Sequence, residues 1–136
     1  MLALRGGSGS RIVVFIAATT VALGAGCRRP GAATPVLLIQ CQVTPSPARV
    51  GPATALIRLT DRTTGRPVPD AGVSVEGDMS HAGMTPVFAT AKAIGDGRYQ
   101  APLTFTMAGD WVLLIKTIVP GRPAEESQIP LPGVRP

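Results

Sequence analysis

The chain has 136 residues, of which 45% are hydrophobic and 15% charged, with a formal net charge of +5. Only 4% are aromatic and the basic residues are scattered rather than clustered, which argues against nucleic-acid binding. A single histidine leaves no credible Ser/His/Asp or Cys/His arrangement, so we expect no enzymatic activity.

The N-terminal segment is typical of an export signal. Two arginines, Arg5 and Arg11, precede the uncharged apolar run Ile12–Leu23, and small residues and Cys27 follow. A helix that crosses a bilayer needs roughly twenty apolar residues, so a permanent transmembrane helix is the weaker interpretation. Residues 1–26 are therefore predicted to be a signal peptide.

The end of this segment, Leu23-Gly24-Ala25-Gly26-Cys27, resembles the lipobox of bacterial lipoproteins, in which the cysteine is acylated before cleavage. We expect Cys27 to carry lipid, palmitate for example, and residues 27–35 to form a tether. The domain would then be exported and held by this lipid anchor on a membrane, facing the periplasm or the cell exterior. An ordinary secretory peptide followed by an unmodified cysteine is the alternative.

Residues 36–131 are predicted to form an all-β domain. Gly and Pro interrupt it every eight to twelve residues, and no segment has a sustained helical period. This pattern predicts an immunoglobulin-like Greek-key β-sandwich of about seven strands. The proline-rich residues 132–136 are expected to fray. The candidate strands are 36–43, 53–60, 72–78, 86–94, 97–105, 110–118 and 126–131.

Alternation of apolar and polar residues is clearest in segment 97–105, where Tyr99 and Phe105 share one face and are expected in the core. The preceding Gly95-Asp96-Gly97 predicts a tight hairpin that makes segments 86–94 and 97–105 neighbours.

Cys41 is the only thiol that remains if Cys27 is acylated, so no internal disulfide can form. Because it lies in an apolar run, we interpret it as a small buried hydrophobe. A soft metal ligand is the alternative.

Candidate metal ligands gather in one short segment. Met79, His81 and Met84 lie within it, and Met107 is the only methionine elsewhere after the signal. Thioether and imidazole groups suit copper, and thioethers favour Cu(I) in particular. We therefore predict a copper site, with packing methionines and a solvated histidine as the alternative.

Five segments together resemble a known family: Gly65–Val68, Ala71–Val75, Met79–Met84, Gly95–Tyr99 and Phe105–Trp111. They resemble the YtkA-like domain, which is related to FixH-type proteins, over roughly residues 36–120. The resemblance implies an Ig-like β-sandwich, often exported or membrane-bound, with a loose association with copper handling and haem-copper oxidase assembly. The four methionine and histidine residues above match the family's Met/His pattern, and Trp111 matches its structural strand tryptophan.

Two hypotheses follow. The first is a lipid-anchored envelope domain that binds a soft metal ion, copper, for tolerance or delivery. The second is a non-catalytic structural or interaction module that holds no metal and contacts an envelope protein partner. Convergence of the three methionine sulfurs and the imidazole within a few ångströms at one end of the sandwich would favour the first, and sulfurs that point separately into the core would favour the second.

Overall fold

Eight strands form two antiparallel four-stranded sheets in the computed structural model, which describes residues 34–81 and 83–136. The expected signal peptide and the lipidation site at Cys27 lie outside the described residues. The strands are β1 (Leu37–Thr44), β2 (Gly51–Asp61), β3 (Gly72–Met79), β4 (Val87–Thr90), β5 (Lys92–Gly95), β6 (Arg98–Phe105), β7 (Gly109–Ile118) and β8 (Glu125–Val134).

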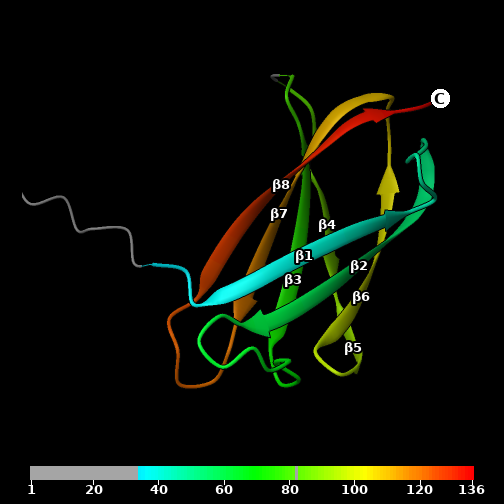
Figure 1. Ribbon diagram of the computed structural model, residues 1–136. Coiled ribbons are helices and arrows are strands. Elements are labelled where there is room, and N and C mark those ends of the chain that lie inside the picture. The colour runs from blue at the N-terminus through cyan, green and yellow to red at the C-terminus, as the bar shows by residue number, and fades with distance from the viewer. Residues whose placement is uncertain (1–33, 82) are drawn as a thin grey trace, which may run out of the picture. The chain divides into compact units, whose positions relative to one another are not determined.

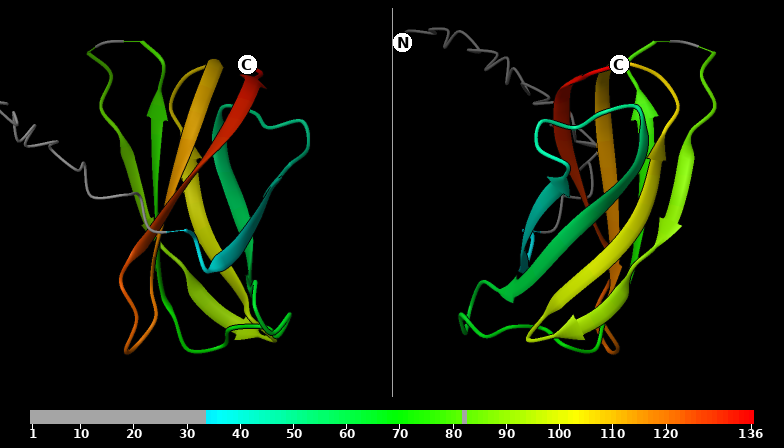
Figure 2. Two further views of the ribbon diagram at one scale, coloured as in Figure 1. Left: turned by 60° about the vertical axis from the view of Figure 1, so that its left-hand side comes forward. Right: turned by 90° about the vertical axis from the view of Figure 1, so that its right-hand side faces the viewer.

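The strand orders are β1-β2-β6-β5 in the first sheet and β4-β3-β7-β8 in the second, and the two sheets face each other (Figure 1, Figure 2). These orders correspond to the A-B-E-D and C′-C-F-G sheets of immunoglobulin domains. The predicted all-β sandwich is therefore confirmed. No helix in residues 34–81 or 83–136 is long and apolar enough to cross a membrane.

The count of strands is eight because the expected strand 86–94 is two strands. Its first part, β4, pairs with β3 in the second sheet, whereas its second part, β5, pairs with β6 in the first. The chain changes sheet at Ala91, whose N–H donates to the carbonyl of Val73 at 2.9 Å.

The predicted hairpin at Gly95-Asp96-Gly97 is confirmed, and it joins β5 to β6. Asp96 and Gly97 both have positive φ, 54° and 66°, as a two-residue type I′ turn requires. The close fit also calls for glycine, since a Cβ on Gly97 would lie 2.7 Å from the carbonyl oxygen of Leu59.

The core lies between the two sheets, and its buried residues fall between Leu37 and Val134. Tyr99, Phe105 and Trp111, the three aromatic residues expected there, are each no more than 1% exposed. The rings of Phe105 and Trp111 meet edge to face, with centroids 5.2 Å apart, an arrangement that aromatic pairs favour.

The C-terminal segment does not fray where its prolines begin. Strand β8 continues to Val134, whose side chain is 2% exposed. The N–H of Arg135 then donates to the carbonyl of Ala48 at 2.9 Å. The expectation is wrong for residues 132–135. Strand β8 is an edge strand, where a proline whose N–H would face solvent removes no ladder hydrogen bond, and Pro132 lies where the register between β7 and β8 shifts.

Candidate metal-binding site

The predicted ligands belong to two loops at one end of the sandwich. Met79 is the last residue of β3, His81 and Met84 follow in the β3–β4 loop, and Met107 lies between β6 and β7. Both loops are at the upper end in Figure 1. The N–H of Ser80 donates to the carbonyl of Asp110 at 3.4 Å, which ties the two segments together.

Met84 and Met107 come together although 23 positions separate them. Both line one open depression between the two loops. Met107 is 48% exposed, a high value for a large apolar side chain, and Met84 is half-buried. The other residues that line the depression are Gly83, Thr85, Pro86, Val87 and Thr106.

The core holds the backbone of Met107 in place. The indole Nε1–H of Trp111 donates to the carbonyl of Met107 at 3.1 Å. Because the Trp111 ring is buried and packed against Phe105, this hydrogen bond attaches the β6–β7 turn to a rigid part of the molecule. The position of one candidate ligand is therefore fixed by the hydrophobic core.

Met79 has a different environment. It is half-buried and packs against the core, with its Cε only 3.1 Å from where a Cβ of Gly109 would lie. It lines a separate depression with Ser80 and Val112. The thioether of Met79 thus fills space beside a glycine, a role that methionine commonly has.

His81 is exposed in the β3–β4 loop, three residues before Met84, and lines neither depression. Across residues 34–81 and 83–136, no three side chains of the His, Cys, Asp and Glu types gather in a way that could hold a metal ion. Thioethers are therefore the ligand type on which the candidate site depends.

Cys41 fits its interpretation as a hydrophobe. Its side chain is half-buried against the core, opposite Ile57 of β2. Burial raises the pKa of the thiol to about 11, which keeps it protonated near neutral pH. Metal ligation needs the thiolate, so this position is unfavourable for a ligand.

Two carboxylates near the site have structural partners. Asp78 accepts a hydrogen bond from the N–H of Met79, and Asp110 accepts one from the N–H of Gly133, each at 2.8 Å. Asp110 thereby connects the start of β7 to the end of β8.

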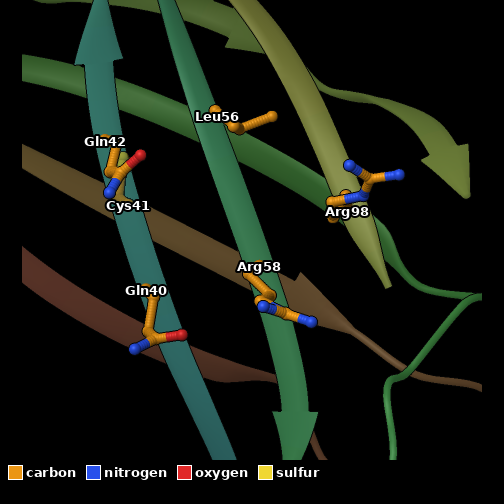
Figure 3. A pocket seen from close by; sticks show the side chains of 6 residues that line it. All are labelled: Gln40, Cys41, Gln42, Leu56, Arg58 and Arg98. Atoms are coloured by element: carbon orange, nitrogen blue, oxygen red, sulfur yellow. The ribbon is translucent and has the colours of Figure 1, made fainter. Parts of the chain in front are cut away.

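One feature of the surface was not expected from the sequence. On the outer face of the first sheet, Arg58 lies opposite Arg98 in the pairing of β2 with β6. With Gln40 and Gln42 of β1 these side chains line a broad depression (Figure 3). The two arginines are 40 positions apart, so only the strand register reveals that they are neighbours.

The chain is similar to one known protein family and to a solved structure. The family model described as YtkA-like matches residues 37–116. No curated protein sequence matches the chain. Among solved structures, the crystal structure of a DUF4426 family protein from Pseudomonas aeruginosa is similar, with a TM-score of 0.56 and 12% identity over 77% of this chain and 96% of that chain. At this identity the likeness concerns the fold alone.

Proposed function

The chain belongs to the YtkA-like family, and we propose that it is a lipid-anchored envelope domain that binds Cu(I) through Met84, Met107 and His81. The observation that carries the proposal is the depression that Met84 and Met107 share. These two methionines come from separate loops and line the same open space, and His81 belongs to the same loop as Met84.

The chemistry of this set suits a soft ion. Thioether sulfur favours Cu(I), and imidazole is also a copper ligand. The family resemblance implies a loose association with copper handling, which supports the same choice. Met79 enters this proposal as a packing residue that supports the loop and not as a ligand, because its Cε contacts the backbone region of Gly109.

The expected anchor gives the site its location. Lipid at Cys27 would hold the domain on a membrane, facing the periplasm or the cell exterior, where it would serve copper tolerance or delivery. Stable anchoring needs more than one acyl chain, which full lipoprotein processing supplies. Mass spectrometry of the protein purified from membranes tests this part, with a Cys27→Ala variant as the control.

Anaerobic titration of Cu(I) against a competing chelator tests the metal site. We would use residues 28–136, which contain every buried core residue of the part that the structure describes. We expect one equivalent to bind more tightly than about 1 μM, which corresponds to roughly 8 kcal/mol.

Leucine variants separate ligation from packing, because leucine replaces methionine with little change of volume. The double variant Met84→Leu/Met107→Leu should lose the site, and His81→Gln should weaken it. Met79→Leu is the matched control and should bind Cu(I) as the unchanged chain does. Binding that survives in the double variant would contradict the proposal.

A metal-free interaction module is the second candidate, and one observation favours it. Phe88 is 72% exposed on β4, a short edge strand. Aromatic residues are enriched at protein interfaces, and an unpaired sheet edge can pair with another chain. If the titration finds no Cu(I) site, cross-linking from position 88 in cells, with position 104 on β6 as the control, would be the next test.

A further inference from the structure

The two sheets differ in charge. The strands of the first sheet carry Arg58, Lys92 and Arg98, and their single carboxylate, Asp61, is paired with Arg122 at 2.8 Å. The strands of the second sheet carry one lysine and five carboxylates, namely Lys116 with Glu76, Asp78, Asp110, Glu125 and Glu126. The sandwich therefore has a basic sheet and an acidic sheet.

The three cations of the first sheet share its outer face. Arg58 and Arg98 are register partners whose chain neighbours, Ile57 and Tyr99, are buried, so both arginines point outward. Lys92 is the partner of Gln100, which lies two residues from Arg98 on the same face. We call Arg58, Lys92 and Arg98 the basic face.

The basic face has few internal partners. Arg98 makes two long contacts: its guanidinium lies 3.8 Å from the exposed carboxylate of Asp96, and its Nε–H donates to the carbonyl of Gly95 at 3.4 Å. An exposed ion pair of this kind contributes little. Arg58 forms no ion pair with any residue in 34–81 or 83–136. Like charges directly opposite each other in a sheet are destabilising, so an external anion would relieve this arrangement.

The shape and the donors of the face indicate which anion would fit. The two guanidinium groups and the amides of Gln40 and Gln42 stand on an open sheet surface, as Figure 3 shows, rather than around a closed cavity. Guanidinium groups bind phosphate well. An extended layer of phosphates matches this surface better than a single enclosed ion does.

We propose that the basic face docks onto the phosphate headgroups of an anionic membrane. The inference rests on the lipid anchor of the proposed function but not on copper binding. The expected tether, residues 27–35, reaches about 30 Å when extended, and it leads to β1, the edge strand of the same sheet. Docking would place the acidic sheet away from the membrane and leave the Met84 and Met107 loops accessible at the side.

Co-sedimentation of residues 28–136 with vesicles tests the proposal without anchor or copper. We expect binding to vesicles that contain phosphatidylglycerol, little binding to phosphatidylcholine vesicles, and loss of binding at high salt. The variant Arg58→Gln/Arg98→Gln should bind about 30-fold more weakly, as expected for two fewer cations at the surface.

A charge-matched control separates the basic face from net charge. Arg49→Gln/Arg66→Gln removes two exposed arginines outside the strands and should retain most of the binding. Circular dichroism melting of both variants checks that they are folded. Equal loss in the two variants, or no binding to phosphatidylglycerol vesicles at low salt, would overturn the proposal. Salt-sensitive self-association without vesicle binding would also overturn it, in favour of contact between the basic and acidic sheets of two copies.

Discussion

Tyr99 ties a loop to the core through a single oxygen atom. Its hydroxyl donates to the carbonyl of Val68 at 2.7 Å and accepts from the N–H of Ala71 at 3.0 Å. Burial raises the pKa of the phenol, so the hydroxyl stays neutral and serves both partners. The long connection between β2 and β3 is thereby held against β6.

We predict that Tyr99→Phe lowers the free energy of unfolding by about 1–3 kcal/mol, since the buried carbonyl of Val68 and the partly buried N–H of Ala71 lose their partner. Urea denaturation followed by tryptophan fluorescence measures the change, and the slope with urea should stay the same. A loss below about 0.5 kcal/mol would mean that water replaces the hydroxyl without cost.

The candidate metal ligands could be identified from the sequence, but the role of each methionine could not. Their clustering around positions 79–84 and 107 is visible in the chain, and so is the softness of their sulfur atoms. The space beside Gly109, which the Cε of Met79 approaches, is not visible. Which methionines pack and which stay exposed depends on that tertiary detail.

At the scale of the elements, the β5–β6 hairpin was the most predictable feature because its turn chemistry is local. Asp-Gly tolerates the two positive φ angles that the turn needs. The break between β4 and β5 was not predictable, because alternation along 86–94 does not specify the partner strand. That choice is made by pairing with β3 and β6.

The hairpin yields a prediction with a matched control. Gly97 and Gly65 have nearly equal φ angles, 66° and 69°. Their surroundings differ. A Cβ on Gly97 would lie 2.7 Å from the carbonyl oxygen of Leu59, whereas a Cβ on Gly65 would meet nothing within 4 Å. Gly65→Ala should cost about 1–2 kcal/mol, the conformational cost alone. Gly97→Ala should cost at least about 2 kcal/mol more, because the two nearest obstructing atoms, in Leu59 and Val68, are backbone and cannot move aside easily. Thermal and urea unfolding would reveal the difference, and equal losses would contradict the argument.

For the molecule as a whole, the spacing of turns and the alternation of apolar and polar residues predict the sandwich. Which side chains become neighbours on its surface depends on the pairing register of the strands. The arginines at 58 and 98 look scattered in the sequence, and pairing of β2 with β6 makes them neighbours. The same holds for the C-terminal prolines, which β8 tolerates only because it is at an edge. Long-range pairing is the information that a single sequence does not display.

The link between Asp61 and Arg122 joins the two sheets and should make stability depend on pH. Asp61 ends β2 in the first sheet, and Arg122 lies in the loop that connects β7 to β8 in the second. Hydrogen bonds from the N–H of Thr64 and from Arg122 lower the pKa of this carboxyl from its ordinary 3.8. The charged form is therefore favoured in the folded state.

Because the pKa of Asp61 is lower in the folded state than its ordinary value of 3.8, the charged carboxylate stabilises the fold in full when the pH is above 3.8. This stabilisation is lost as the pH falls below 3.8 and through the lowered pKa. We predict that Asp61→Asn, which retains an oxygen acceptor but removes the charge, is less stable than the unchanged chain at pH 7. The difference should shrink steadily as the pH falls below 3.8. Chemical denaturation of both proteins over this range measures it, and the other carboxyls cancel in the comparison. A difference that stays constant with pH would show that Asp61 acts through shape alone, and that the two sheets are not joined by its charge.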